Sequence, residues 1–504
     1  MATLGIELSA ERLVGSVFGT SNLVWASIIG LILIYLTIGY VIGGRLADRS
    51  PKFVTLYVII SWGGFLAGLA PLVARPVLRL ASDAFDELQL GVLFGSFSSV
   101  LILLSPSVTL LGMVSPFAIR LAVQNMHQSG RTAGDIYAIS TLGSFIGTFL
   151  PGLVLIPLIG TVRTFLLFSG VLLLVAFWGL WKAAGWRKVL YFAWMPVVLV
   201  VLFLWLGSGP IKRTTGQIFE TESAYNYIQV LEVDGFRMLR LNEGQGIHSF
   251  WHPTVLDYLG PWEQFLAAPF FNTAPFYFNQ VERIGIIGLA AGTTANQATV
   301  VYGAVPIDGY EIDPKIIQIG REYFAMNQPN LNAIAMDGRW GLANSDQLYT
   351  VIGIDAYRPP YIPWHLTTQE FFQEVRQHLT EDGVVAMNVG SDANDMSLIE
   401  GLVSTLQTVF PSVYLMEIPN TFNFIIYAST QPTSMENLYQ NYVALASKEG
   451  VHPLLLASIR RVIENQHPLP GETQVFTDDR APIEWITNRM VMNFLLFDDL
   501  ELIK

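Results

Sequence analysis

Six long apolar runs occupy roughly the first 207 of the 504 residues, and they limit the possible folds more than any other feature. The runs cover about residues 22–44, 53–74, 88–117, 136–159, 162–181 and 187–207. About 20 apolar residues are enough for a helix to cross a bilayer, and repeated runs without a cleavage context are not signal peptides. We therefore expect residues 1–210 to form a multi-pass α-helical membrane domain of about six helices, in contact with the lipid bilayer.

Prolines and glycines shape the expected helices. The third run is too long for one straight crossing, so we expect Pro106 and Pro116 to kink or end its helix. Glycines recur inside the runs, as at Gly39, Gly43 and Gly147, which indicates closely packed helices. Acidic and basic residues are missing from the middle of the runs, which argues against an ion or proton pathway.

Charge and rare residue types exclude several classes of function. The net charge of −12 lies mostly in the second half, and no cluster of Lys and Arg there indicates nucleic acid binding. The chain has no cysteine, which excludes disulfides and thiolate metal sites. His248, His252 and His365 share no metal-ligand spacing with acids, so we expect structural or supporting roles for them and no metal.

Residues 211–280 are expected to form a small β subdomain and the lead-in to a second domain. Alternating residues predict strands over 224–233 and 236–241, joined by a turn at Asp234-Gly235. Residues 262–278 are rich in aromatic side chains, which either fill a core or rest against the membrane half. We favour the core, because an exposed aromatic patch needs a specific reason.

Residues 281–504 alternate between strands and helices, which predicts a Rossmann-like α/β domain with an open, mostly parallel sheet. A strand over 283–287 runs into the small-residue turn Gly288-Leu289-Ala290-Ala291-Gly292, and the next strand ends on Glu311. The spacing from Gly288 to Glu311 is 23 residues, near the ~20 typical of nucleotide-binding βαβ units. Later strands end at Asp337-Gly338 and Asp355, so three acids are expected at one edge of the sheet.

Several ordered motifs together resemble one family. They are Gly43 to Arg49, Tyr225-Asn226-Tyr227-Ile228, Tyr310-Glu311-Ile312-Asp313-Pro314, Asp337-Gly338 and Asp355-Ala356-Tyr357-Arg358-Pro359. In this order the chain resembles the spermidine synthase (polyamine aminopropyltransferase) family in its membrane-fused bacterial form, over nearly its whole length.

The resemblance implies an S-adenosylmethionine-dependent transferase whose nucleophile attacks the three-carbon chain of the sulfonium and releases 5′-methylthioadenosine. Asp355 would be the catalytic base. The implied residues around the S-adenosylmethionine or decarboxylated S-adenosylmethionine are Gly288, Ala290, Ala291, Gly292, Glu311, Asp337 and Gly338, and those around the small-molecule substrate are Arg358, Tyr357, Asn226 and Glu263. Soluble members of the family suggest a homodimer.

Two departures from the family pattern point to a different substrate. Ala291 stands where the family carries an Asp for the amine of the decarboxylated donor, and Arg358 stands where a second Asp holds the far amine of putrescine. The loss of two carboxylates and the gain of a guanidinium suit a substrate with a carboxylate better than a diamine. We therefore hypothesise that the donor is ordinary S-adenosylmethionine, leading either to 3-amino-3-carboxypropyl transfer or to intramolecular cyclisation to a lactone.

Other functions stay open at this point. One is spermidine formation from putrescine, and another is a methyltransferase, which would release S-adenosylhomocysteine. A third is a transporter with a nucleotide-binding regulatory domain, which the facilitator-like loop at Gly43 to Arg49 favours.

The basic loops give a conflicting signal about topology. Basic residues gather at Arg45, Arg49 and Lys52, at Arg120 and Arg131, and at Lys182, Arg187 and Lys188. Such loops favour the cytoplasm, and following them through six crossings would leave the C-terminal domain outside. A cytosolic adenosyl donor requires that domain inside, so we expect an integral protein of the bacterial inner membrane with a cytoplasmic catalytic domain.

Overall fold

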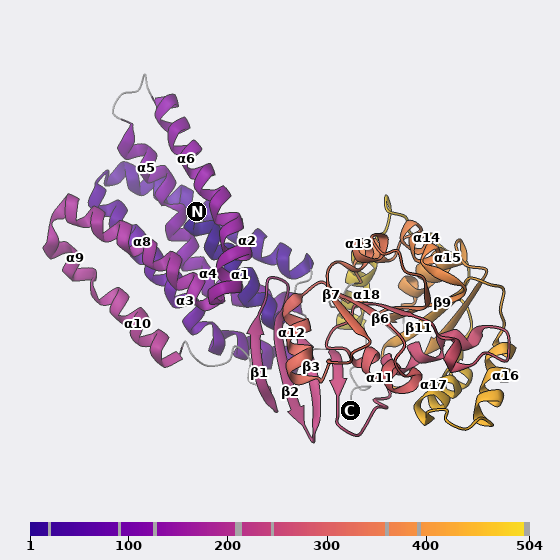
Figure 1. Cartoon of the computed structure of the whole chain (residues 1–504). Coiled ribbons are helices and arrows are strands. Elements are labelled where there is room, and N and C mark those ends of the chain that lie inside the picture. The colour runs from indigo at the N-terminus through magenta and orange to yellow at the C-terminus, as the bar shows by residue number, and fades with distance from the viewer. Residues whose placement is uncertain are drawn as a thin grey trace. The chain divides into compact units, whose positions relative to one another are not determined.

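The computed structural model describes residues 1–18, 22–88, 92–123, 129–206, 214–242, 246–357, 362–390 and 395–497. The chain divides into two compact units, whose elements are labelled in Figure 1. The first contains Met1–Thr214, Glu220–Tyr227 and Asn242–Gly244, and the second contains Thr215–Phe219, Ile228–Leu241 and Gln245–Lys504. The predicted limits at residues 210 and 280 stay predictions for independently folding domains.

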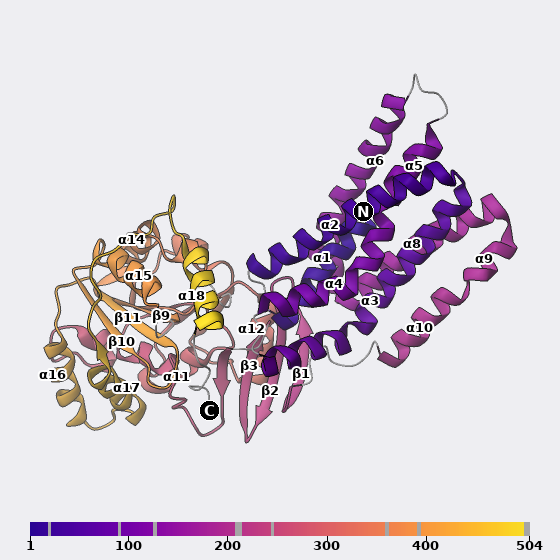
Figure 2. The same ribbon diagram turned by 180° about the vertical axis from the view of Figure 1, so that it is seen from behind.

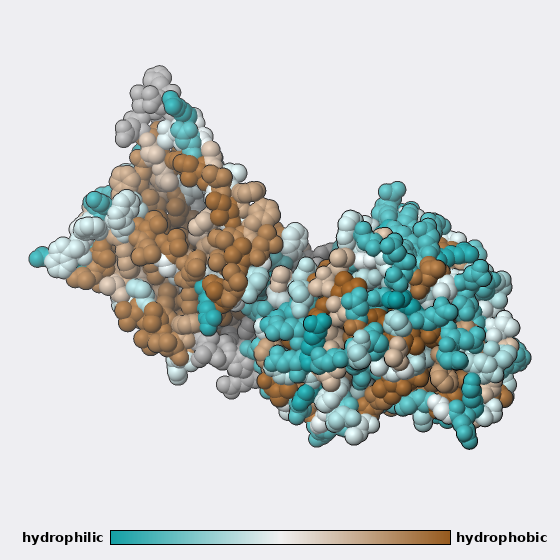
Figure 3. Space-filling model, in the orientation of Figure 1, coloured by the Kyte–Doolittle hydropathy of each residue, from teal (hydrophilic) through white to brown (hydrophobic). Residues whose placement is uncertain are grey.

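The first unit is helical. Its elements are α1 (Ala2–Phe18), α2 (Asn22–Arg49), α3 (Phe53–Leu88), α4 (Val92–Gly112), α5 (Val114–Ala122), α6 (Ser129–Leu150), η2 (Pro151–Leu155), α7 (Ile156–Ile159), α8 (Thr161–Ala184), α9 (Trp186–Phe192) and α10 (Trp194–Leu206). Within the described residues, six stretches are long and apolar enough to cross a membrane: Trp25–Arg49, Phe53–Ala74, Ser98–Ala122, Ser129–Ile159, Thr161–Ala184 and Trp186–Leu206. Brown, hydrophobic residues cover much of the face of this unit seen in Figure 3, as expected for a lipid-facing surface.

The third apolar run breaks at a different place from the one predicted. Helix α4 continues through Pro106 to Gly112, and the break falls at Met113, before α5. Pro116 takes the third position of α5, where a missing N–H removes no bond within the helix. The expected close packing is confirmed, because a Cβ on Gly39 would lie 2.4 Å from the Thr109 carbonyl oxygen.

A four-stranded antiparallel sheet precedes the Rossmann-like part. Its strands, in spatial order, are β1 (Gln217–Glu222), β2 (Tyr227–Val233), β3 (Phe236–Leu241) and β4 (Ile247–Trp251). The predicted hairpin is confirmed: β2 and β3 join through Asp234 and Gly235, which both have positive φ, as a tight hairpin turn requires. The sequence analysis did not predict β1 and β4 as strands.

The second sheet has eight strands in the order β12-β10-β11-β9-β8-β5-β6-β7. They are β5 (Ile284–Ile287), β6 (Ile307–Glu311), β7 (Leu331–Ala335), β8 (Tyr349–Ile354), β9 (Leu379–Gly390), β10 (Ser412–Glu417), β11 (Asn423–Ser429) and β12 (Gln466–His467). Strands β5 to β9 are parallel to their neighbours among themselves, and the pairs beyond β9 are antiparallel. The carboxyl ends of β5, β6, β7 and β8 therefore share one edge, as predicted.

Helices cover both faces of this sheet. They are α11 (Thr293–Tyr302), α12 (Pro314–Tyr323), α13 (Gly338–Ala343), α14 (Gln369–Gln377), α15 (Ser397–Gln407), α16 (Met435–Ala446), α17 (Pro453–Glu464) and α18 (Ile483–Phe497), with the short helices η3 (Trp262–Phe271), η4 (Phe278–Gln280) and η5 (Trp364–Leu366). One apolar cluster joins the sheet to η3, α11, α16 and α17, and the other joins it to α14, α15 and α18. Figure 2 shows α18 beside α15.

All ten residues of η3 are buried, so the aromatic-rich segment belongs to the core, as predicted. Strand β9 contains Asp382 and Gly383, and its register with β8 shifts between Tyr349 and Val351, so the first part of this strand is irregular.

Candidate active site

The small-residue turn after β5 lies against the end of β8. Gly288 has a φ of +89°, and a Cβ there would come within 2.4 Å of the Asp355 carbonyl oxygen, so the position requires glycine. Ala290 also has a positive φ, and Gly292 leads into α11 in the left-handed conformation. The turn therefore brings the ends of two adjacent strands together without side chains between them.

Glu311 reaches back from the end of β6 to the same turn. Its Oε2 accepts a hydrogen bond of 2.9 Å from the Ala290 N–H, and its Oε1 accepts one of 3.0 Å from the Asp313 N–H. Burial raises the pKa of the Glu311 carboxyl to about 7, although these backbone donors oppose the shift. The two bonds hold the carboxyl group at the mouth of the turn, where the sequence predicts a ribose ligand.

Ala291 contributes shape instead of a polar contact. Its N–H donates to Ser249 Oγ at 2.9 Å, which ties the turn to β4. The residue is 1% exposed and belongs to an apolar cluster with Ile316 and Phe324. Position 291 is therefore packed on its side-chain side by hydrocarbon, and it offers no carboxylate to an amine.

Asp355 follows β8 and is held from β9. Its N–H donates to the Ile287 carbonyl at 2.8 Å, and its Oδ1 accepts a 2.8 Å hydrogen bond from Asn388 Nδ2. Burial raises the pKa of Asp355 to about 6, and the Asn388 bond opposes that shift. Tyr357 fixes the following loop, because its hydroxyl accepts a hydrogen bond from the Gly390 N–H.

The sequence analysis did not single out Asn388. It lies near the carboxyl end of β9, after a run of apolar residues, and its importance depends on a contact across 33 residues of chain. The one available signal was its place as a polar residue near a strand end.

Asp337 and His365 form a second contact at the carboxyl edge. Asp337 caps α13 through the Trp340 N–H and lies 3.0 Å from His365 Nε2, which lowers the pKa of Asp337. The His365 carbonyl accepts a hydrogen bond from Arg339, whose guanidinium also binds the carboxylates of Glu374 and Asp478. The predicted supporting role of His365 thus has a defined partner. A Cβ on the neighbouring Gly338 would lie 2.4 Å from the Ile287 side chain of β5, so α13 begins close to that strand.

Three predicted substrate residues are not brought to this site by the described contacts. Asn226 belongs to the first unit, where its Oδ1 accepts a hydrogen bond from Asn242 Nδ2. Glu263 is fully buried, and its carboxyl accepts hydrogen bonds from the backbone N–H groups of Tyr258 and Gly260. These contacts give Glu263 a loop-shaping role, and its predicted substrate contact stays a prediction. Arg358 lies outside the described residues.

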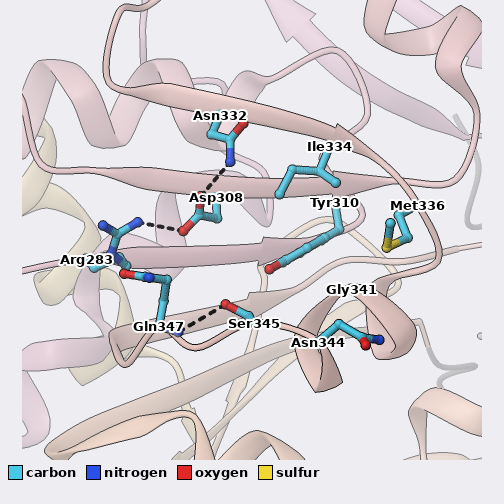
Figure 4. A pocket seen from close by; sticks show the side chains of 10 residues that line it. All are labelled: Arg283, Asp308, Tyr310, Asn332, Ile334, Met336, Gly341, Asn344, Ser345 and Gln347. Carbon is cyan, nitrogen blue, oxygen red and sulfur yellow. Dashed lines mark hydrogen bonds and ion pairs between the residues drawn. The ribbon is translucent and has the colours of Figure 1, made fainter.

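The cavity in Figure 4 lies along β6 and β7. It has a volume of about 430 Å³ and is lined by Arg283, Asp308, Tyr310, Asn332, Ile334, Met336, Gly341, Asn344, Ser345 and Gln347. Residues at the amino ends of β5, β6 and β7 contribute to its wall. Asp308 lies between Arg283 and Asn332 and is bound to both, so its carboxylate already has protein partners. The acids at the carboxyl edge make a better candidate active site.

A mostly parallel α/β core with acids at the ends of adjacent strands defines the class of protein, one with a Rossmann-type nucleotide-binding domain. The sequence profile of the spermine/spermidine synthase domain matches residues 280–442. The polyamine aminopropyltransferase of Vibrio vulnificus is 32% identical over 300 residues, which cover 57% of this chain and 97% of that protein. The chain belongs to the spermine/spermidine synthase family.

Other similarities are partial. The probable polyamine aminopropyl transferase of Bifidobacterium longum is 31% identical over 289 residues, which cover 54% of this chain and 62% of that protein. The crystal structure of a probable spermidine synthase from Corynebacterium glutamicum aligns with a TM-score of 0.39 and 18% identity, over 52% of this chain and 99% of that one.

Proposed function

We propose that this chain is a membrane-bound transferase that moves the three-carbon group of an S-adenosyl sulfonium onto an amine and releases 5′-methylthioadenosine. The observation that carries the proposal is the partly buried Asp355: its backbone lies against the Gly288 turn, its carboxyl group accepts a hydrogen bond from Asn388, and its pKa is raised to about 6. Family membership supports the reaction type. The six candidate spans support attachment to a membrane, and a cytosolic donor supports a cytoplasmic catalytic domain.

In the proposed reaction the neutral amine attacks the carbon bound to the sulfonium. The C–N bond forms while the C–S bond breaks, and both electrons of the C–S bond go to sulfur, which leaves as a neutral thioether. The new ammonium gives one proton to Asp355, which passes it to water. With a pKa near 6, Asp355 is mostly ionised at pH 7 and able to accept that proton.

Other residues would bind the donor. Glu311 would accept the ribose hydroxyls at the mouth of the turn, and Asp337 would face the adenine side, held by His365. The sulfonium loses its charge during attack, so the apolar surroundings would favour the transition state over the ground state. A homodimer, which the resemblance to the family suggests, is also part of the proposal.

The finer proposal is that the donor is S-adenosylmethionine and not its decarboxylated form. The support comes from position 291, where a buried methyl group packs in an apolar cluster. A donor ammonium would find no carboxylate on this residue. The exchange of the second family Asp for Arg358 adds a positive charge, which suits a substrate with a carboxylate better than a diamine.

A product assay tests both the reaction type and the identity of the donor. The full chain, in lipid nanodiscs, is given either donor with or without putrescine, and the nucleoside product is identified by chromatography. We expect methylthioadenosine from S-adenosylmethionine only when an amine is present. If methylthioadenosine forms from the decarboxylated donor and not from S-adenosylmethionine, the donor assignment is refuted. If S-adenosylhomocysteine forms, the reaction type is refuted. Methylthioadenosine without any amine would instead indicate lactone formation.

A further inference from the structure

Asn388 has a buried side-chain amide whose oxygen has no hydrogen-bond partner among the described residues. The residue is 5% exposed, and its Nδ2 donates to Asp355 Oδ1 at 2.8 Å. Its Oδ1 is buried and has no hydrogen-bond partner in the part of the chain that the structure describes. A buried acceptor without a donor is destabilising, so the working enzyme is expected to supply one.

The strand register directs this free oxygen to the site. Strands β8 and β9 are parallel and pair Ile354 with Met387, so Asp355 and Asn388 follow opposite one another. Val351 and Val384, on the same alternating rows, belong to the apolar cluster of η3. Both polar side chains therefore lie on that face of the sheet, just beyond its hydrocarbon.

The hydrogen bond to Asp355 also fixes which way the amide is turned. An ionised carboxylate only accepts hydrogen bonds, so Nδ2 has to face it and Oδ1 has to face away from Oδ1 of Asp355. The pair thus offers two acceptors next to each other, the free oxygen of Asp355 and Oδ1 of Asn388.

We propose that Asn388 Oδ1 accepts one N–H of the attacking amine while Asp355 accepts the other. This inference rests on the proposed function. A primary amine has two N–H bonds and one lone pair, so binding both N–H groups directs the lone pair at the sulfonium-bound carbon. The same two acceptors repel a carboxylate nucleophile, so Asn388 selects against lactone formation from the donor itself.

The test compares amines that differ by one N–H. The full chain is assayed with its donor and either putrescine or N,N′-dimethylputrescine, and kcat/KM is measured from methylthioadenosine release. A secondary amine leaves one acceptor unpaired, so we expect putrescine to be favoured by between about fivefold and a hundredfold. Equal use of the two amines by the unaltered protein would overturn the role of Asn388 without touching the reaction type.

Asn388→Leu separates recognition from simple positioning. Leucine has a similar volume and no acceptor, so the preference for putrescine should fall to about one and KM for the amine should rise. Asn388→Gln keeps the amide oxygen and the amide NH₂ group and should retain part of the preference for putrescine. Methylthioadenosine affinity should stay unchanged in both variants, which checks that they fold. A slower Asn388→Leu enzyme with the preference intact would mean that Asn388 only positions Asp355.

The two proposals fail in distinguishable ways. No methylthioadenosine from either amine would remove the proposed function, and this inference with it. Methylthioadenosine from both amines at equal kcat/KM would remove only the assignment of Asn388.

Discussion

The two ends of the eight-stranded sheet hold their aspartates differently. At the amino ends, Asp308 accepts hydrogen bonds from Arg283 at 2.7 Å, from Asn332 at 2.9 Å and from Tyr349 at 3.2 Å. At the carboxyl ends, Asp355 has one side-chain donor, Asn388, and burial raises its pKa to about 6. A carboxylate with a full set of donors stabilises the fold, whereas one that is partly buried with few donors is able to exchange a proton.

The cavity does not by itself identify the reacting acid. The space of about 430 Å³ runs along β6 and β7, from Asp308 near the amino end to Met336 after the carboxyl end, and the one acid in its lining, Asp308, already has protein partners. The number of hydrogen-bond donors around each acid is the better guide to the reacting group in this fold.

The largest expected effect is on Asp355. Asp355→Asn keeps the shape and a possible contact with Asn388 but removes the base, so we expect turnover to fall by about 10²- to 10⁴-fold. Methylthioadenosine affinity should change little, because Glu311 and the turn remain. Turnover is measured from nucleoside release and affinity by calorimetry.

A matched control tests whether this loss belongs to the carboxyl edge. Asp382, on β9 near its amino end, accepts a hydrogen bond from Thr380 and has no place in the proposed chemistry. Asp382→Asn should keep normal turnover. If Asp355→Asn turns over as fast as Asp382→Asn, Asp355 is not the base and the contrast between the two ends has no catalytic meaning.

The next effect is on stability. Asp308→Ala removes the shared acceptor of Arg283, Asn332 and Tyr349, and we expect a loss of about 2–4 kcal/mol, or a thermal midpoint lower by roughly 5–10 °C. Turnover below the unfolding temperature should stay near normal. Scanning fluorimetry of the full chain gives the midpoint, with the exposed Asp346→Ala as control. A stable but inactive Asp308→Ala would place chemistry at the amino ends.

The sequence predicted the carboxyl edge better than the amino edge, for a physical reason. Glu311 is the last residue of β6 and Asp355 directly follows β8, so the strand pattern along the chain is enough to place both at one edge of the sheet. Asp308 and Asn388 owe their roles to partners 25 and 33 residues away, which no local pattern reveals.

Helix α1 was not predicted, because its apolar residues follow the period of a helix and make no continuous run. Ile6 and Ala10, one helical turn apart with Glu7 and Ser9 between them, are both buried in the core of the helical unit with Phe168.

The smallest expected effect is on the pH dependence of kcat/KM. It distinguishes an acid that exchanges a proton, such as Asp355, from one that only stabilises the fold, such as Asp308. Because the pKa of Asp355 is raised to about 6, its base form is lost as the pH falls through 6, and kcat/KM should fall about tenfold per pH unit below that point. Stability should move the other way. The folded state binds this proton more tightly than the unfolded chain does, so the contribution of Asp355 to stability is full below pH 4 and declines as the pH rises through 6.

Asn388 gives this profile a second test. Its hydrogen bond lowers the pKa of Asp355 against the effect of burial, so Asn388→Leu should move the inflection in kcat/KM to higher pH. Asp355→Asn should remove the inflection altogether from the residual rate. An inflection near pH 6 that persists in Asp355→Asn would assign the titration to another group, with Glu311 as the first candidate because burial raises its pKa to about 7. In that case the ribose carboxyl, and not the acid beside Asn388, would limit the rate at low pH.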